Sequence, residues 1–441
     1  MIELEGKYTK AKIFASTVDE GVISQVYDII NCKAFEGQRV VCMPDVHVGA
    51  SGPCGLVATI GDYVCPEHIG VDIGCSVSMI VLSSKIPEDR YAEFERMVKE
   101  KIPFGFNLHP KVIVNDKYVC AVLSDVFSKC KVTWPEMLSE LPDEVTTDWI
   151  SEQLKRIGIS EDVFYRSIGT VGGGNHFIEY DEGDDVAGVT LHFGSRNFGK
   201  RVCEYWTEIA NKVFSKDEMQ QMIYGFKAEY VKTHSDMRNF KADLDAYIES
   251  KKEGRIKGYL NGENMKGYLR DMCFAQAYAG INHMIVRKLI HEILAIFFIW
   301  EEGWIVSVHN FIDLEDHTLR KSAVRSYKWQ AVLVPFNMRD GVAICEGLSN
   351  SEWLNSCAHG AGRKLSRSAA KATLKLEDFQ ETMKNVYSTT VCEGTIDEAP
   401  MAYKDTEEIK DLIKQTCVVK HMLLPKINIK AVEDGKRKSK M

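Results

Sequence analysis

The spacing of apolar and polar positions changes character several times along the chain. Between residues 20 and 30, apolar residues recur at helical spacing after Asp19, which predicts an amphipathic helix. From Val40 to Ile80 the pattern becomes short apolar runs separated by Gly, Pro and Asp. Such runs are typical of strands joined by tight loops, so the first part of the chain predicts a helix followed by a strand-rich region.

The later part of the chain alternates between helical and strand-like patterns. Residues 200–300 form a long, mostly helical block, whose charged stretch 227–257 favours a solvated helical surface, with RNA or partner binding as the alternative. Strand-like runs are found at Gly188–His192, Trp304–Val308, Ala331–Pro335 and Val342–Ile344. Further helical spacing covers 87–101, 118–130, 135–157 and 366–376. We predict one α+β domain over residues 1–425 with a mixed β core, a helical insertion at about 200–300, and a basic, disordered tail over 426–441.

Composition narrows the class of protein only a little. A formal net charge of −8 excludes a chain that is basic all over, so an RNA-binding role would need a local basic groove. The 13 cysteines lack paired spacing, which favours free thiols in a reducing cytoplasm. The longest apolar run, Ile293–Trp300, is too short to span a bilayer and predicts a core helix. We therefore expect a cytoplasmic protein that does not cross a membrane.

Five short segments place metal-binding or nucleophilic side chains among glycines and other small residues. Asp, Cys and His are ligands for borderline-soft divalent metals, and neighbouring glycines let a backbone or a phosphate approach closely. One Asp, one Cys and three His suffice for two metals that share the thiolate, which leaves a fourth His for another role. The segments are Val71–Cys75, Gly172–Glu179, Leu191–Arg196, Val308–Asn310 and Ala358–Arg363.

Asp72 and Cys75 illustrate what this pattern leaves open. They stand three residues apart in a glycine-bounded turn, so both side chains can face one cation. A thiolate has the lone pairs to bridge two metals, and metal binding keeps it deprotonated. Equally, a buried cysteine and a turn-forming aspartate fit a purely structural role, and a histidine on a strand is more often structural than a ligand. The residues alone leave both interpretations standing.

His359 is the candidate nucleophile. Small residues flank it, so the α-phosphate of a nucleotide can reach the imidazole in line. Arg363, and a helix expected just after it, offer a cation and free backbone N–H groups to phosphate oxygens. Histidine can form a covalent phosphoramidate, which divides a difficult condensation into easier steps.

Seven motifs in order give the chain a resemblance to a known family. It resembles the RtcB family of RNA-splicing ligases, and the match runs from about residue 40 to 420. Each motif is weak evidence by itself, but the ordered set is specific. The motifs are Met43–His47, Gly70–Cys75, Gly174–Phe177, His309–Asn310, Cys357–Arg363, Pro400–Asp405 and Cys417–Lys420.

The resemblance implies a metal-dependent ligation. Asp72, Cys75 and His176 would hold one Mn²⁺, and Cys75, His192 and His309 a second. His359 would be guanylylated by GTP. The implied reaction joins an RNA 3′-phosphate or 2′,3′-cyclic phosphate to a 5′-hydroxyl through an activated 3′ end, in tRNA splicing or RNA repair. A small activator, archease, serves some members of the family. The alternative is an enzyme that caps 3′-phosphates with a nucleotide and ligates little.

The resemblance also implies a nucleotide site, and here the sequence departs from the family. The family pattern Pro-Gly-Ser-Met-Gly with a later Ser becomes Pro335–Arg339 with Val342, which predicts weakened or altered GTP preference, with Phe336 stacking on the purine as compensation. Basic residues expected to contact phosphate or RNA are Arg196, Arg320, Lys321 and Arg363. The implied nucleotide-binding residues are Asn175, His176, Phe177, Glu179, His309, Asn310, Pro335, Phe336, Asn337, Met338, His359, Gly360, Ala361, Gly362 and Lys420.

Overall fold

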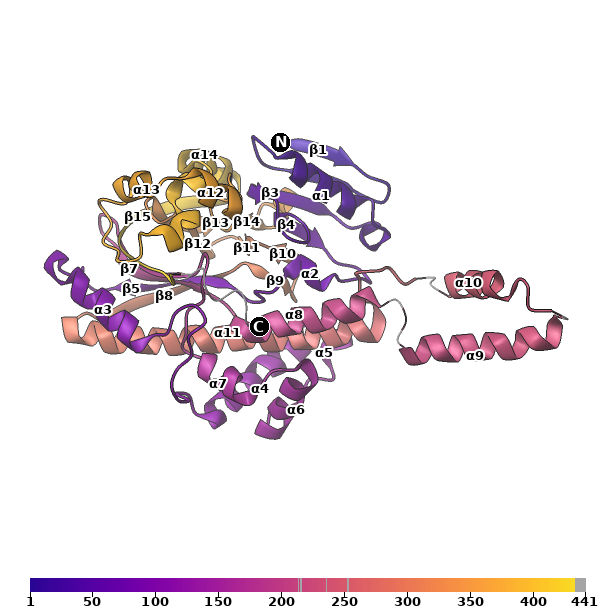
Figure 1. Cartoon of the computed structure of the whole chain (residues 1–441). Coiled ribbons are helices and arrows are strands. Elements are labelled where there is room, and N and C mark those ends of the chain that lie inside the picture. The colour runs from indigo at the N-terminus through magenta and orange to yellow at the C-terminus, as the bar shows by residue number, and fades with distance from the viewer. Residues whose placement is uncertain (213, 215, 235, 252–253, 433–441) are drawn as a thin grey trace.

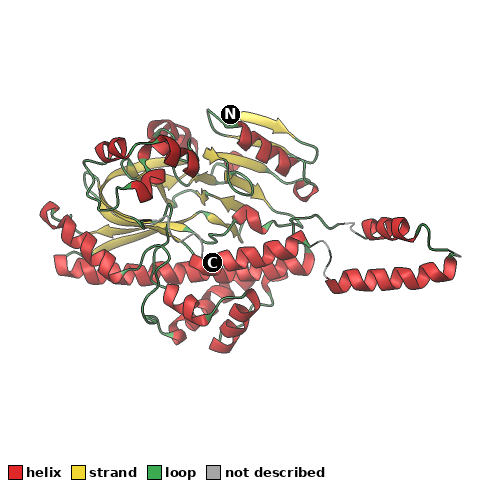
Figure 2. Cartoon of the chain, in the orientation of Figure 1, coloured by secondary structure: helices red, strands yellow, loops and turns green. Residues whose placement is uncertain are grey.

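Two large sheets lie above a layer of helices in the computed structural model, which describes residues 1–212, 214, 216–234, 236–251 and 254–432 (Figures 1 and 2). One sheet has seven strands in the order β12 (Ala331–Asn337), β13 (Gly341–Gly347), β15 (Cys417–Ile429), β6 (Phe177–Glu182), β7 (Ala187–Phe193), β5 (Ser76–Leu82) and β8 (Glu301–Val308). Its neighbouring strands are all antiparallel. The mixed α+β architecture predicted from the sequence is confirmed.

The second sheet has six strands and carries the N-terminus. Its order is β1 (Ile2–Glu5), β2 (Lys10–Ile13), β3 (Val40–His47), β4 (Cys54–Thr59), β10 (Thr318–Lys321) and β9 (Asn310–Asp313). Strands β2 and β3 pair in parallel, whereas the other pairs in this sheet are antiparallel. A short ribbon of β11 (Ala323–Arg325) and β14 (Ser356–Ala358) completes the strands of the described residues.

The longest helix, α11 (Gly262–Leu294), runs beneath β5 and β8, with α8 (Arg196–Asn211) alongside it (Figure 1). Phe274, Tyr278 and Ile281 recur at helical spacing on its buried face. Phe198 of α8 meets Phe274 with ring centroids 4.6 Å apart, so an aromatic core joins the two helices. The other helices are α1 (Glu20–Ile30), α2 (Pro66–Ile69), α3 (Tyr91–Lys101), α4 (Asp116–Thr133), α5 (Pro135–Leu138), α6 (Thr147–Ile157), α7 (Glu161–Ser167), α12 (Arg367–Thr373), α13 (Leu376–Thr382) and α14 (Thr406–Leu412).

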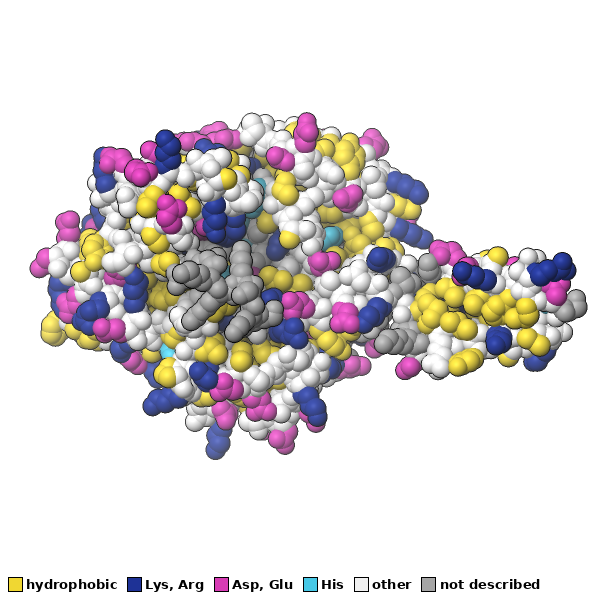
Figure 3. Space-filling model, viewed as in Figure 1, with side chains coloured by type: hydrophobic (Ala, Val, Ile, Leu, Met, Phe, Trp, Pro, Cys, Tyr) yellow, Lys and Arg dark blue, Asp and Glu magenta, His cyan; other side chains and the backbone are white. Residues whose placement is uncertain are grey.

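The predicted helical block 200–300 divides into two parts with different roles. Helices α8 and α11 belong to the body, whereas α9 (Lys216–Thr233) and α10 (Phe240–Ser250) project from it as an arm (Figure 1). Hydrophobic side chains gather on the arm face drawn in Figure 3. Phe226 and Tyr247 stack with ring centroids 4.8 Å apart, so aromatic contacts hold the two arm helices together.

The predicted core helix over Ile293–Trp300 is wrong beyond its start. Helix α11 ends at Leu294, and Phe298 adopts a φ of 58°, which an α-helix cannot continue through. The side chain of Phe298 is 85% exposed, and strand β8 begins at Glu301. The apolar composition of residues 293–300 gave no indication of this turn. Among the described helices, none combines the length and apolar composition that a membrane span requires.

The sheet continues past the predicted boundary at residue 425. Ile427 and Ile429 of β15 are buried and pair with Tyr180 and Ile178 of β6, so residues 426–429 belong to the folded domain. Residues 427–429 are all buried, which corrects the predicted start of the tail. Residues 433–441 of that tail lie outside the described residues. The 13 cysteines are all free, as their spacing predicted.

Candidate metal centre and nucleophile

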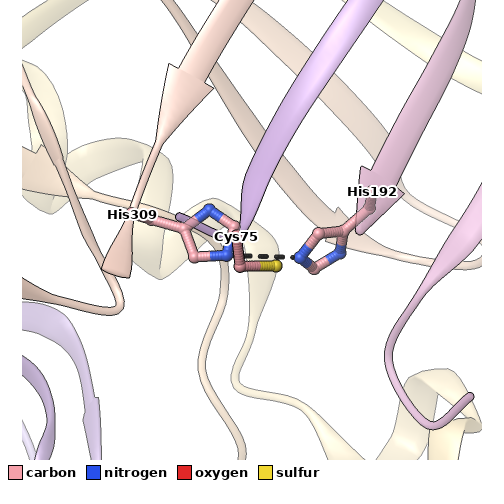
Figure 4. A group of neighbouring side chains, drawn as sticks. All are labelled: Cys75, His192 and His309. Carbon is pink, nitrogen blue, oxygen red and sulfur yellow. Dashed lines mark hydrogen bonds between the residues drawn. The ribbon is translucent and has the colours of Figure 1, made fainter. Parts of the chain in front are cut away.

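Five predicted metal ligands converge at the ends of adjacent strands. Cys75 belongs to two groups of side chains, one with His192 and His309 and the other with Asp72 and His176. Within each group the candidate ligand atoms all lie within 4.8 Å of one another. Figure 4 shows His192 and His309 on either side of the Cys75 thiol. The structure therefore gathers all five residues that the sequence selected, with the cysteine common to both groups.

Strand register explains how residues so far apart in sequence meet. Ser76, directly after Cys75, pairs with Phe193 of β7 and with Val308 of β8. The residues adjoining these pairs therefore cluster at one end of three neighbouring strands. His192 belongs to β7 itself, as the strand-like run Gly188–His192 predicted. A strand holds a ligand more rigidly than a loop does.

Two geometric relationships define the cluster. His176 Nε2 lies 2.8 Å from Asp72 Oδ2 and 3.6 Å from Cys75 Sγ. His192 Nε2 lies 3.3 Å from His309 Nε2. The Nδ1 atoms of His176 and His309 are buried and have no hydrogen-bond partner among the described residues. Nitrogen, oxygen and sulfur donors that face a common point fit a pair of borderline divalent metals.

Hydrogen bonds of Asn310 connect the turn that carries Asp72 and Cys75 to the segment that carries His309. Its side-chain N–H donates to the carbonyl of Asp72 at 3.2 Å, and its own carbonyl accepts from Gly74 N at 2.8 Å. His309 N donates to the Cys75 carbonyl at 2.9 Å. The side-chain oxygen of Asn310 accepts from Ser322 N at 3.0 Å. The side chain predicted to bind nucleotide is therefore engaged in positioning the candidate metal ligands. Asn175, the other predicted asparagine, is exposed.

Burial sets the charge states of the cluster. It lowers the pKa of His192 and of His309 well below the ordinary value, so both imidazoles are neutral and keep a lone pair. Burial would raise the pKa of Asp72, but His176 outweighs it and lowers that pKa. Burial, reinforced by Asp72, raises the pKa of the Cys75 thiol. A bound cation reverses such a rise and deprotonates the thiol, so this donor set fits metal ions.

His359 lies beside the cluster and is oriented by a carboxylate that the sequence analysis missed. Its Nδ1 is 2.7 Å from Asp45 Oδ2, and its backbone N donates to the same oxygen at 3.2 Å. Asp45 is fully buried. The His359 and His309 rings have centroids 4.9 Å apart. Because Nδ1 is occupied, Nε2 of His359 remains for chemistry. The motif Met43–His47 contained Asp45, but nothing local linked it to His359.

Gly362 is required for the Asp45–His359 contact. Its φ of 73° lies in the left-handed region, and a Cβ there would collide with the carbonyl oxygen of Asp45. The glycine therefore lets the loop after His359 pack directly on the strand that carries the carboxylate. Gly194 plays the same part at the metal cluster, where a Cβ would collide with Asp72 Oδ1.

The four basic residues predicted to contact phosphate differ in how deeply they are buried and in how they are paired within the protein. Arg320 is fully buried and donates to Asp313 at 2.9 Å and Asp316 at 2.6 Å, so it holds the protein together and the prediction for it is wrong. Lys321 donates to the Ile69 carbonyl at 2.8 Å. Arg196 donates to Thr170 Oγ1 at 3.0 Å and to a backbone carbonyl at 2.6 Å. These last two are partly buried and close to the cluster.

Arg363 is also engaged within the protein. Its guanidinium lies 3.3 Å from Glu398, and it donates to the Leu365 carbonyl at 3.0 Å. The helix expected directly after it begins only at Arg367, with Ser366 accepting from Ala369 N at 3.1 Å as its cap. The helix predicted over residues 366–376 is therefore present, and its first residue lies four positions after Arg363.

The altered segment Pro335–Arg339 covers the end of β12 and most of the tight turn, residues 338–340, that leads into β13. Asn337 Oδ1 accepts from the backbone N of Arg339 and of Asp340, both at 3.0 Å, and so closes the turn. Phe336 is 3% exposed and packs in the core, so it is not free to stack on a purine as predicted. Met338 is also buried, whereas the carbonyl of Pro335 lies against Gly360 of the His359 loop.

Two lysines, Lys420 of β15 and Lys430 directly after it, differ in burial. Lys420 is 46% exposed, with its ammonium 3.4 Å from Glu346 on the neighbouring strand. Lys430 is only 2% exposed, 3.3 Å from the His176 carbonyl and 3.7 Å from Glu398. Its ammonium lies 5.5 Å from the centre of the Phe177 ring. The alternation of residues 427–430 was the signal that could have shown a continuing strand.

Glu179, predicted to contact nucleotide, is buried near the same lysine. It accepts a hydrogen bond from Asn428 of β15, and burial raises its pKa to about 7. Phe177 remains partly exposed between Lys430 and His192, with the Phe177 and His192 rings 5.3 Å apart. Glu179, Phe177 and Lys430 therefore form one wall next to the metal cluster.

Comparison with known proteins gives a consistent result. A family model described as "tRNA-splicing ligase RtcB" matches residues 25–431. The "RNA-splicing ligase RtcB" of Escherichia coli strain K12 is 27% identical over 398 residues, covering 85% of this chain and 86% of that protein. The "tRNA-splicing ligase RtcB" of Archaeoglobus fulgidus is 24% identical, covering 91% and 89%. That of Nanoarchaeum equitans is 24% identical, covering 84% and 83%. The family match extends beyond residue 420, where the motif resemblance ended.

Proposed function

The chain belongs to the RtcB family, and from that premise we propose that it is an RNA ligase that joins a 3′-phosphate or 2′,3′-cyclic phosphate end to a 5′-hydroxyl end. GTP supplies the activating nucleotide, and the biological setting is tRNA splicing or RNA repair in the cytoplasm. The names of its relatives as RNA-splicing ligases support this proposal, as does the intact set of metal ligands.

One observation carries the mechanistic part of the proposal. His359, held through Nδ1 by Asp45, lies beside His309 of the metal cluster. Five other residues already form the two ligand groups, so His359 is left for nucleophilic chemistry. Two Mn²⁺ ions, one in each group, fit the mixed N, O and S donors, and when bound they supply positive charge for the phosphate oxygens.

The chain's own residues then account for the first step. His359 Nε2 attacks the α-phosphorus of GTP, so a P–N bond forms and the bond to the pyrophosphate oxygen breaks. Asp45 keeps the proton on Nδ1 and stabilises the positive imidazole that develops during attack. Arg196 and Lys321, close to the cluster, are the cations that we assign to phosphate contacts.

The later steps transfer the nucleotide to RNA. The 3′-phosphate of RNA attacks the histidine-bound GMP and releases His359, giving an activated 3′ end. The 5′-hydroxyl of the second RNA attacks that activated phosphate, a phosphodiester forms, and GMP leaves. A 2′,3′-cyclic phosphate is first opened by water to the 3′-phosphate. The face drawn in Figure 3 mixes Lys and Arg with Asp and Glu, so RNA contacts are expected near the site rather than across a basic surface.

The resemblance implies that a lysine contacts the nucleotide, and it points to Lys420. We assign this contact to Lys430 instead. Its buried ammonium lies beside Phe177 and the His176 carbonyl, whereas Lys420 faces Glu346 at the surface. The turn Pro335–Arg339 lacks the family's glycines, and Val342 lacks its hydroxyl, so we propose a preference for GTP that is weaker than the family pattern implies.

A joining assay with defined RNA ends tests the proposal. The protein is incubated with Mn²⁺, GTP or ATP, a 3′-phosphorylated RNA and a 5′-hydroxyl RNA. We expect a joined product that disappears when the 3′ end is a hydroxyl. Accumulation of RNA capped with a nucleotide, without joining, would instead support the capping alternative that the altered turn at Phe336 suggests. Adding an archease-like activator shows whether turnover requires one. Absence of both products with every nucleotide would contradict the proposal.

A further inference from the structure

A second cluster of reactive side chains lies where β3, β4 and β10 meet. Cys54 begins β4 and pairs in register with His47, the last residue of β3. Lys321 ends β10, the strand on the other side of β4. The three side chains therefore come from adjacent strands of the six-stranded sheet and belong to neither group of metal ligands.

One hydrogen bond orients the His47 ring. Its Nδ1 lies 2.9 Å from the Asp45 carbonyl oxygen and donates to it. That bond occupies Nδ1 and leaves Nε2 for Cys54, the residue opposite His47 in the strand register. Cys54 is one of four cysteines that are only partly buried. A thiol beside an anchored imidazole and an ammonium is the arrangement that activates cysteines.

Electrostatics agree with this geometry. Burial opposes ionisation of Cys54, but His47 and Lys321 outweigh it and lower the pKa of the thiol to about 6. Burial likewise opposes the charge of His47, yet the Cys54 thiolate and Asp45 raise its pKa. His68 of the nearby helix α2 is neutral, because burial and Lys321 lower its pKa to about 4. Both shifts are in the direction that favours a thiolate–imidazolium pair at Cys54 and His47.

The other accessible cysteines provide a natural comparison. Nine of the 13 cysteines are buried, and besides Cys54 only Cys32, Cys120 and Cys392 are partly exposed. Burial and Asp116 raise the pKa of Cys120, so that thiol is less reactive than an ordinary one. Cys392 lies against the hydroxyl of Thr395 rather than a cation. Cys54 shares its intermediate burial with these three, and it has an imidazole as its strand partner and a lysine on the adjacent strand.

We propose that Cys54 is a modification site at which the thiolate, paired with His47, reacts with low-molecular-weight disulfides. In that step the Cys54 sulfur forms a new S–S bond to one half of the reagent. The S–S bond of the reagent breaks, and the departing thiolate takes up a proton from water. The product is a mixed disulfide that a small thiol reverses by the same exchange.

The modification would also affect the nucleophile, an extension that rests on the proposed function. Gly55, next to Cys54, packs against Asp45, since a Cβ built on this glycine would lie 3.3 Å from Asp45 Oδ1. The other carboxylate oxygen of Asp45 holds His359. His47, the strand partner of Cys54, donates to the Asp45 carbonyl, so a group attached at Cys54 disturbs a residue that contacts Asp45 and should slow nucleotide transfer.

Competitive labelling of the intact protein tests the modification site. The full chain is treated with oxidised glutathione, or with iodoacetamide as a second probe, and labelling at each cysteine is followed by peptide mass spectrometry. At pH 6 roughly half of the molecules of a thiol with pKa near 6 are ionised, against about one in three hundred for an ordinary thiol. A thiolate of lower pKa is a weaker nucleophile, which offsets part of this difference and leaves a rate advantage of about tenfold. We expect Cys54 to react about tenfold faster than Cys32, Cys120 and Cys392 at pH 6.

Two further measurements make the outcome decisive. The Cys54 rate should level off above pH 7 while the other three rates still rise, and His47→Gln should slow labelling of Cys54 alone. Equal rates for the four cysteines, or a Cys54 rate that rises like the others, would overturn the proposal. Inhibition of nucleotide transfer by oxidised glutathione should be absent in Cys54→Val. Because labelling needs no ligase activity, failure of the proposed function leaves this test intact.

Discussion

Asp45 Oδ2 accepts from both the backbone N–H and the ring Nδ1 of His359, at 3.2 and 2.7 Å. One buried carboxylate oxygen thereby fixes the position and the tautomer of the imidazole. Asp45 is on β3 of the six-stranded sheet and His359 directly follows β14, so the contact depends on how the sheets pack. This relationship leads to the first prediction.

Asp45→Asn should slow formation of the nucleotide adduct by about 10²–10⁴-fold, because an amide that donates to Nδ1 leaves the proton on Nε2. The metal content should stay unchanged, since Asp45 is not among the ligands. Single-turnover labelling gives the rate, and elemental analysis gives the metal content. Wild-type labelling rates in the variant would show that the carboxylate does not orient the nucleophile.

Cys75→Ala should remove bound metal, because the thiol is common to both ligand groups. Elemental analysis of protein reconstituted with Mn²⁺ should fall from about two ions per chain toward zero, as expected when a shared ligand is lost. Cys203→Ala is the matched control, because that buried thiol lies outside the cluster. Retention of two ions in Cys75→Ala would rule out a bridging role.

Lys430→Met should raise the GTP concentration needed for half-maximal adduct formation by about tenfold or more, the usual value of a charge-assisted hydrogen bond. Lys420→Met serves as the control and should leave that concentration unchanged, because Lys420 faces Glu346 at the surface. Thermal unfolding establishes that both variants are folded. The reverse order of effects would return the nucleotide contact to Lys420.

Glu398 should make stability depend on acid pH. Burial opposes its charge, but Lys430, Arg367 and Arg363 outweigh burial and lower its pKa from 4.5 to about 2. Since the folded pKa is depressed, the stabilisation is complete above pH 4.5 and is lost as pH falls toward 2. It amounts to about 3 kcal/mol at most.

The test of that prediction is urea unfolding of wild type and Glu398→Gln between pH 7 and 3. The free energy of unfolding of the wild type should exceed that of the variant at neutral pH, and the gap should narrow below pH 4.5. Parallel curves across this range would mean that Glu398 contributes no ionisation-linked stability.

The grouping of the candidate ligands was predictable because the local sequence marks each of them. Cys75 lies in a short glycine-marked turn, and His309 adjoins Asn310, whose hydrogen bonds now explain why the two turns stay together. The predicted strand-like runs Gly188–His192 and Val342–Ile344 lie within β7 and β13, which extend one to three residues beyond them. Periodicity and glycine placement are properties of the local sequence, so they can be recognised without knowledge of the tertiary fold.

The roles that failed depend on contacts between distant residues. Arg320 looked like a phosphate contact, yet Asp313 and Asp316 neutralise it in the core. Phe336 looked available for stacking but packs in the core, and Val342 is equally buried. Replacing Val342 with the family's serine would therefore put a hydroxyl among apolar side chains, so the loop cannot be restored by that change alone.

The central claim is that His359 carries the nucleotide, and one labelling experiment tests it most directly. Wild type and His359→Ala are incubated with Mn²⁺ and GTP labelled at the α-phosphate, and labelled peptides are mapped. We predict acid-labile label on the wild-type peptide that contains His359, no label on the variant, and equal metal content in both. A variant that forms the adduct at the wild-type level would contradict the assignment of His359 as the nucleophile.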